Sequence, residues 1–165
     1  MTLKTLSAVA LAAVLAGCAA TGPRYSEVAN VQQVSASNAR LVIFRTKEST
    51  QYSGRAAAVR IDGNASGSCD FGGFNTFDIA PGKHVVAVDM WDSPGKCELP
   101  VDVSGGSSYF FEVQPRLGNL LSFIGAGIIG ASVESSGRQC GGAFSIVPVE
   151  AAAALSKLSE LRATR

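Results

Sequence analysis

The sequence predicts a mainly β protein, an antiparallel β-sandwich of the immunoglobulin or transthyretin type with one α-helix at its C-terminus. Three observations lead to this fold class. Apolar and polar residues alternate over several short stretches, turn residues separate these stretches, and the last apolar stretch has helical periodicity. The 18 glycines and six prolines supply the frequent turns. Short alternating strands with a turn every few residues are typical of two packed sheets.

The first strands carry the clearest signals. Residues 41–44 are Leu-Val-Ile-Phe, so this strand is apolar on both faces and is expected in the centre of a sheet. Val59 and Ile61 alternate with polar residues in the next strand. Asp62-Gly63-Asn64 follows, and these residue types accept the positive φ angles of a tight hairpin. The sequence therefore predicts a hairpin at this turn.

A second turn is expected at Pro81-Gly82, because proline presets φ and glycine accepts the left-handed position of a type II turn. Phe77 and Ile79 alternate with polar residues before this turn, and residues 84–91 form the returning strand. We therefore predict that the two strands form a hairpin around Pro81-Gly82.

The remaining elements follow in order. Residues 99–103 alternate between apolar and polar, 109–113 form a further strand, and 143–149 form the last strand. Residues 150–162 are predicted to be helical because apolar residues recur at a helical spacing. The predicted apolar face of this helix consists of Ala151, Ala154, Leu155, Leu158 and Leu161.

The N-terminus has the form of a secretory signal. Lys4 precedes an apolar run over residues 6–16 that is too short to span a bilayer as a mature helix. The run ends in Leu15-Ala16-Gly17-Cys18, which resembles a lipobox. We expect cleavage before Cys18, and a diacylglycerol plus an N-acyl chain such as palmitate on this cysteine, because stable anchoring needs more than one chain.

These features divide the chain into three parts. Residues 1–17 are the predicted signal peptide, 18–38 the lipid anchor and a flexible tether, and 39–165 the β-sandwich with its C-terminal helix. The predicted location is the cell envelope, on the periplasmic face of the outer membrane, because Ala19 rather than an aspartate follows the lipidated position.

The charge balance argues against nucleic acid as a partner. The chain has 14 basic and 13 acidic residues, and removal of residues 1–17 takes away Lys4 alone, which leaves 13 of each. A balanced domain without a basic stripe lacks the electrostatic footprint of a nucleic-acid-binding protein.

Four segments together resemble a known family. They are Ala39–Arg45, Val59–Gly63, Ala80–His84 and Gly106–Phe111. In this order they look like the bacterial lipoprotein family catalogued as domain of unknown function 2846, and the likeness runs from about Arg40 to Leu161. The resemblance implies a periplasm-facing β-sandwich on a lipid anchor, with no established activity. It therefore supports the fold without supplying a mechanism.

Three cysteines remain after Cys18, and two of them are expected to pair in an oxidising periplasm. If Pro81-Gly82 is a hairpin, its register places Cys69 opposite about residue 95, which favours a Cys69–Cys97 disulfide. Cys69–Cys140 and Cys97–Cys140 are the alternatives. The cysteine left over would be a buried thiol or, at Cys140, a reactive one.

The sequence predicts no enzyme, cofactor or metal site. Gln139-Cys140-Gly141 superficially resembles the surroundings of a cysteine nucleophile, but nothing places the single histidine, His84, near Cys140 as the required base. The cysteines and the histidine lack zinc-ligand spacing. The alternative hypothesis is a periplasmic redox or hydrolytic enzyme that uses the Cys140 thiol.

The most unusual segment is 117–133, which is apolar, rich in glycine and without charge. It is shorter than a spanning helix requires. It is either a loop that contacts the membrane or an envelope protein partner, or a hairpin buried in the protein's own core. Its candidate contact residues are Leu120, Leu121, Phe123, Ile124, Ile128 and Ile129. The function that we predict is a non-enzymatic binding or structural module, whose partner the sequence does not name.

Overall fold

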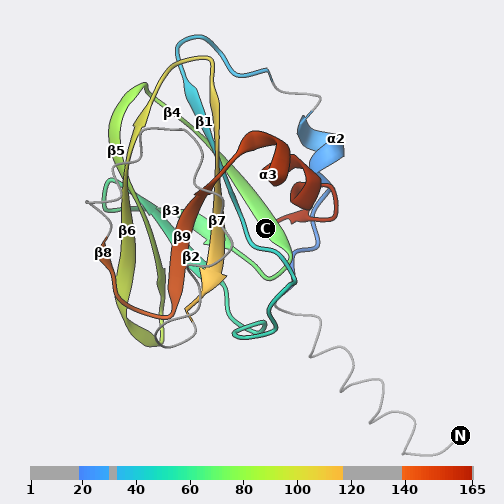
Figure 1. The fold of residues 1–165 in the computed structure, drawn as a ribbon, viewed down its shortest axis with the longest axis vertical. Helices are drawn as coiled ribbons and strands as arrows, with labels where there is room; N and C mark the ends of the chain where they lie inside the picture. Colours follow the sequence, from blue (N-terminus) through green and yellow to red (C-terminus); the bar gives the residue numbers. More distant parts are fainter. Residues whose placement is uncertain (1–18, 30–32, 117–138, 165) are drawn as a thin grey trace, which may run out of the picture.

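The computed structural model describes residues 19–29, 33–116 and 139–164 (Figure 1). Two sheets pack face to face, and each contains five strands. This arrangement confirms the predicted β-sandwich with a C-terminal helix. In the first sheet the order is β10-β4-β1-β7-β9, and in the second it is β3-β2-β5-β6-β8.

The strands of the first sheet are β1 (Ala39–Phe44), β4 (Gly73–Ile79), β7 (Ser108–Pro115), β9 (Phe144–Val149) and β10 (Arg162–Ala163). The strands of the second sheet are β2 (Ala57–Ile61), β3 (Asn64–Cys69), β5 (Gly82–Met90), β6 (Ser93–Val103) and β8 (Gln139–Cys140). The two described helices are α2 (Tyr25–Ala29) and α3 (Ala151–Leu158), which lie on the outer side of the first sheet (Figure 1).

Strand β1 lies in the centre of the first sheet, and all of its residues are buried, as its apolar sequence predicts. It pairs antiparallel with β4 but parallel with β7, where Arg40 is opposite Ser108. The sheet is therefore mixed rather than wholly antiparallel. The reason is topological: the chain passes through the second sheet after β4 and re-enters the first at the end where β1 begins.

The two predicted hairpins have different outcomes. β2 and β3 form a hairpin, and its turn residues Asp62 and Gly63 have φ angles of 53° and 80°. Pro81 and Gly82 instead connect the two sheets, because β4 pairs with β1 and β10 whereas β5 pairs with β2 and β6. The predicted hairpin around Pro81-Gly82 is therefore wrong.

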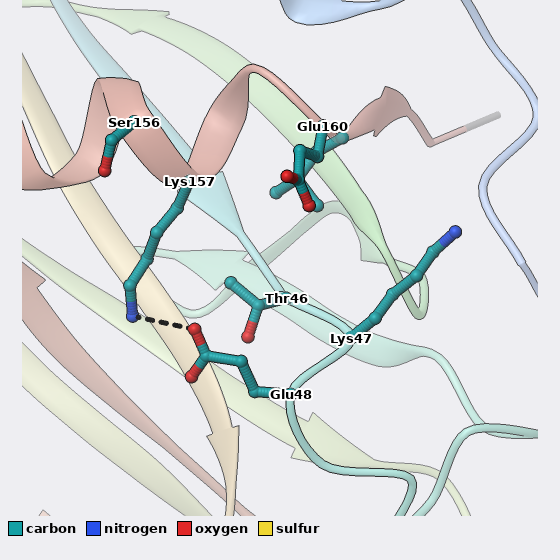
Figure 2. Close-up of a pocket in the computed structure, with 7 residues that line it drawn as sticks. Thr46, Lys47, Glu48, Ser156, Lys157 and Glu160 are labelled. Atoms are coloured by element: carbon teal, nitrogen blue, oxygen red, sulfur yellow. Dashed lines mark ion pairs between the residues drawn. The ribbon is translucent and has the colours of Figure 1, made fainter.

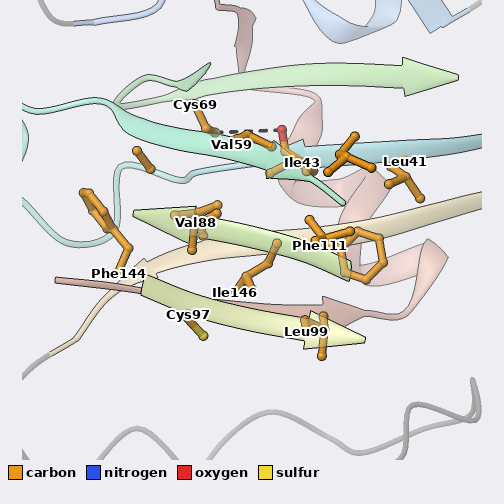
Figure 3. Packing of buried hydrophobic residues seen from close by; sticks show 14 of the residues in the cluster. Leu41, Ile43, Val59, Cys69, Val88, Cys97, Leu99, Phe111, Phe144 and Ile146 are labelled. Atoms are coloured by element: carbon orange, nitrogen blue, oxygen red, sulfur yellow. Dashed lines mark hydrogen bonds between the residues drawn. The ribbon is translucent and has the colours of Figure 1, made fainter. Parts of the chain in front are cut away.

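Both faces of the first sheet are buried. Leu41 and Ile43 of β1 point into the inner core between the sheets (Figure 3), whereas Val42 and Phe44 point into an outer core beneath α3. Helix α3 contributes Ala154 and Leu158 to the outer core. A strand whose successive side chains enter two cores must be apolar throughout, which explains the uninterrupted run at 41–44.

Helix α3 is shorter than predicted. It begins after Glu150, whose carboxylate accepts hydrogen bonds from the backbone N–H groups of Ala152 and Ala153 at 2.8 and 3.4 Å. Ala151 and Leu155, two residues of the predicted apolar face, are exposed. The helix ends at Leu158 because the chain turns there to place β10 beside β4.

The segment predicted as a flexible tether is docked on the domain. The backbone N–H of Ala20 donates to the carbonyl oxygen of Phe71 at 3.3 Å, and that of Gly22 donates to Ala163 O at 3.0 Å. The Tyr25 ring packs edge-on against Phe74, with ring centroids 5.2 Å apart. Backbone hydrogen bonds and the Tyr25 ring therefore hold residues 19–25 against the first sheet. No local sequence pattern predicts this pairing.

Candidate functional site

The two ends of the sandwich differ in chemistry. We call the end where β1 and β5 finish, at Phe44 and Met90, the Arg45 end, and the end where β5 begins, at Gly82, the His84 end. Strands from both sheets meet at the Arg45 end, which is the lower end in Figure 1. Within the residues that the structure describes, no helix is long and apolar enough to cross a membrane.

Arg45 follows β1 and is only 1% exposed. Its Nη1 donates to Arg55 O at 2.7 Å and its Nη2 donates to Gln51 O at 2.8 Å. The guanidinium lies 5.5 Å from the ring centroid of Phe71 and 4.8 Å from that of Phe144. Burial lowers the pKa of Arg45, yet arginine keeps its charge in proteins. The buried cation thus ties a surface loop to the end of both sheets.

The cysteines correct the predicted disulfide. Cys97 of β6 and Cys140 of β8 are directly opposed and form a disulfide, whereas Cys69 is a fully buried free thiol. Cys69 lies on β3 at one edge of the second sheet, and β2 and β5 separate it from Cys97. The favoured Cys69–Cys97 pairing fails because it depended on a hairpin at 81–82.

The structure does not provide the free thiol and the neighbouring base that the chemistry suggested for Cys140 requires. Cys140 is bonded to Cys97, and burial raises the pKa of the Cys69 thiol, which disfavours the nucleophilic thiolate. His84 lies four residues along β5 from Val88, the partner of Cys97. At a rise of about 3.4 Å per residue, this separation is roughly 14 Å. His84 and Cys140 therefore do not form a nucleophile–base pair.

The histidine has its own partners at the His84 end. Its Nδ1 lies 2.7 Å from Asp62 Oδ2, and its Nε2 lies 2.9 Å from Ala80 O. The hydrogen bond with Asp62 raises the pKa of His84 despite partial burial, and it lowers the pKa of Asp62. Over the described ranges, no group of three His, Cys, Asp or Glu side chains could hold a metal ion.

A polar recess of about 490 Å³ lies between α3 and the loop after β1 (Figure 2). Lys157 dominates it: its Nζ lies 2.9 Å from Glu112 Oε2 and 3.6 Å from Glu48 Oε1. Glu112 is nearly buried, so Lys157 neutralises a carboxylate beneath the recess. The remaining lining residues are Thr46, Lys47, Ser156, Glu160 and Leu161.

Sequence reasoning missed this ion pair because Glu112 and Lys157 lie 45 residues apart. The only signal was a carboxylate within the apolar stretch Phe110-Phe111-Glu112-Val113, which demands a partner once the strand is buried. The carboxylates of Glu112 and Glu48 hold the Lys157 amine within the recess. The lining therefore suits the support of α3 better than the capture of an ion.

Among the described residues of the Arg45 end, Trp91 is the most exposed large apolar side chain, at 79% exposure. It occupies the turn between β5 and β6, and the Arg55 guanidinium lies 5.6 Å from its ring centroid. Arg55 also pairs with Asp92 at 2.8 Å. The sequence interpretation treated Trp91 as the end of a strand and missed it. The signal lay in Asp92-Ser93-Pro94-Gly95, which places the tryptophan at a turn.

Two predicted sites lie outside the described residues. They are the lipidation residue Cys18 and the segment 117–133 with Leu120, Leu121, Phe123, Ile124, Ile128 and Ile129. The residues on either side of 117–138 are described, and they lie together. Arg116 donates to Ala143 O through its backbone N–H and to Cys140 O through Nη1, each at 2.8 Å. The described residues that flank 117–138 therefore lie at the Arg45 end, next to the disulfide.

Comparison with known proteins adds no relative: no family model matches the chain, and neither a curated protein nor a solved structure matches it. The resemblance to the family of domain of unknown function 2846 therefore stays a prediction from the sequence.

Proposed function

We propose that this protein is a lipid-anchored module of the bacterial envelope, held to the periplasmic face of the outer membrane by acyl chains on Cys18. In this proposal the β-sandwich binds or supports another envelope component and catalyses no reaction. The single observation that carries the anchoring proposal is the lipobox-like Leu15-Ala16-Gly17-Cys18 at the end of a short apolar run.

The folded domain supports this proposal through its first described residues. Ala19 and Ala20 pair with Phe71, so the chain is already part of the domain one residue after the proposed lipid attachment. Residues 1–17 are then the removable part of the chain, and cleavage before Cys18 leaves every contact of residues 19–25 in place.

The binding role is favoured over the thiol-enzyme alternative by the state of the cysteines. Cys140 is occupied by a disulfide and Cys69 is enclosed in the inner core. The proposed contact segment, 117–133, lies outside the described residues, but two hydrogen bonds from Arg116, to Ala143 O and to Cys140 O, hold together the described residues on either side of 117–138. Holding the flanking residues together lowers the entropy that a partner-binding segment between them would lose on binding.

The anchoring proposal is tested by the intact mass of the protein purified from membranes. The expected mass is that of residues 18–165 plus a diacylglycerol and an acyl chain. The Cys18→Ser variant should keep the mass of the full precursor and should carry no added lipid. Thr21→Ser, at an exposed position three residues after Cys18, is the matched control and should behave as the native protein. A native protein that retains residues 1–17 without added lipid would overturn the proposal.

The binding proposal is tested by crosslinking in intact cells, followed by mass spectrometry of the purified adducts. We expect one reproducible envelope protein, and its loss when Ile128 and Ile129 are replaced by serine in a protein that still folds. If only uncrosslinked protein is recovered, or if a thiol reagent labels Cys140 rapidly in the folded native state, the thiol chemistry becomes the better hypothesis.

A further inference from the structure

The starting observation is how closely Ala19, the residue after the proposed attachment point, is held to the Arg45 end. Ala19 forms a bridge with Phe71, and consecutive Cα atoms are only about 3.8 Å apart. Gly22 lies so close to Ala163 that an added Cβ would approach its carbonyl oxygen to 2.5 Å. Little chain is therefore free between Cys18 and the domain, and acyl chains on Cys18 would bring this end of the sandwich to the bilayer.

Trp91 belongs to the same end, because a continuous series of contacts leads to it. Ala20 N donates to Phe71 O at 3.3 Å, and the Phe71 ring lies 5.5 Å from the Arg45 guanidinium. Arg45 donates to Arg55 O at 2.7 Å, and the Arg55 guanidinium lies 5.6 Å from the Trp91 ring. The exposed Trp91 and Ala19, the residue after the proposed attachment point, are thus connected through the contacts of the buried Arg45.

The chemistry of this turn suits a bilayer surface. Tryptophan concentrates at membrane–water interfaces because its ring is apolar whereas its N–H needs a polar partner. Trp91 is 79% exposed, and the Arg55 side chain beside it is 48% exposed. Arg55 pairs with Asp92 through Nε at 2.8 Å, and the other N–H groups of its guanidinium can donate to a lipid phosphate.

We propose that Trp91 inserts into the headgroup region of the membrane that holds the lipid on Cys18, with Arg55 beside the lipid phosphates. This inference rests on the proposed lipidation. The sandwich then stands on its Arg45 end, and the His84 end points into the periplasm. The nine residues of β5 span roughly 30 Å, so the two ends cannot both touch the bilayer.

Trp91 reports on its own position because it is the single tryptophan of the chain. The experiment uses residues 18–165 coupled through Cys18 to a maleimide phospholipid in phosphatidylcholine vesicles. Cys97 and Cys140 are joined and Cys69 is buried, so position 18 is the reactive thiol. We expect a blue-shifted emission, and a loss of about twofold when the vesicles contain phosphatidylcholine with brominated acyl chains.

The matched control moves the attachment to the opposite end. Lys83 is exposed at the start of β5, eight residues or roughly 27 Å from Trp91, so Lys83→Cys combined with Cys18→Ser tethers the His84 end. In this variant the emission should match that of the free protein and resist the brominated lipid. Equal emission from the two tethered forms, or free access of iodide to Trp91 in the Cys18-tethered form, would overturn the orientation.

The two proposals fail in different ways. The chemical tether replaces the native lipid, so the vesicle experiment tests the orientation whether or not cells acylate Cys18. The intact mass of the membrane-purified protein tests the acylation whether or not Trp91 meets lipid.

Discussion

Two arginines, one within β1 and one directly after it, show how the ends of this sandwich differ. Arg45, at the Arg45 end, is fully enclosed and bonds backbone carbonyl oxygens between two aromatic rings. Arg40, toward the His84 end, forms a bidentate ion pair with Asp78, in which both N–O distances are 2.7 Å. The Asp78 side chain is 40% exposed, and the hydrogen bond from Arg40 lowers its pKa.

The difference shows that a buried arginine stabilises the Arg45 end, whereas ion pairs with half-exposed carboxylates stabilise the His84 end. At the Arg45 end, the buried Arg45 side chain bonds the loop that precedes β2, and the Cys97–Cys140 disulfide joins β6 to β8. At the His84 end, the ion pairs of Arg40 and His84 remain within reach of water. Removing a buried partner leaves groups without hydrogen bonds, whereas water can replace a surface partner.

The largest effect is expected from Arg45→Met. Methionine keeps much of the volume but leaves the carbonyl oxygens of Gln51 and Arg55 without their donors, which should cost about 4 kcal/mol. Arg40→Met is the matched control, and its cost should be about 1 kcal/mol because water can solvate the freed Asp78. Urea unfolding measures both free energies. Equal losses of unfolding free energy in the two variants would contradict the difference between the buried arginine of the Arg45 end and the ion pair of the His84 end.

The disulfide comes next. Its cysteines are 43 residues apart, and replacing both Cys97 and Cys140 with alanine should lower the free energy of unfolding by about 3 kcal/mol. A reducing agent should destabilise the native protein similarly and leave the double variant unchanged. Peptide mapping checks the connectivity, and recovery of a Cys69–Cys97 peptide would contradict the proposed closure of the Arg45 end.

Backbone packing closes the His84 end and predicts a smaller effect. A Cβ on Gly105 would collide with the carbonyl oxygen of Ala36, so Gly105→Ala should cost about 2 kcal/mol through a local backbone shift. Gly54, near the Arg45 end, has no atom within 4 Å of an added Cβ, and Gly54→Ala should be neutral or slightly stabilising. Thermal unfolding of the two variants tests this, and a neutral Gly105→Ala would show that the contact is loose.

The smallest effect is the pH dependence of the His84–Asp62 pair. The pKa of His84 is raised above 6.5, so its stabilisation is complete below pH 6.5 and is lost as the pH rises through the folded pKa. The pKa of Asp62 is lowered below 3.8, so its stabilisation is complete above that pH and is lost as the pH falls through the folded pKa. The pair therefore contributes most between these two values.

Between pH 6 and 9 the free energy of unfolding should fall by less than about 1 kcal/mol, because the Asp62 side chain is 46% exposed. His84→Gln should flatten this dependence, and histidine chemical shifts in NMR should report the raised pKa. An unchanged slope in His84→Gln would assign the effect to other groups.

Local sequence patterns determined much of this fold. The apolar run at 41–44 predicts a strand buried on both faces, because each side chain's face depends only on alternation along the strand. Asp62 and Gly63 adopt positive φ as predicted, because turn conformation depends on the residues of the turn itself.

Only the tertiary structure decided which strands are neighbours. Pro81 and Gly82 bend the chain equally well within a sheet or between sheets, and the inner core between the sheets favours the crossover. That choice places β2 and β5 between Cys69 and Cys97, makes β7 parallel to β1, and brings Cys140 opposite Cys97. The docking of residues 19–25, the enclosure of Arg45 and the exposure of Trp91 likewise depend on contacts between distant segments. Alternation and turn chemistry carry no information about such contacts, because they report the conformation of a segment and not its partner.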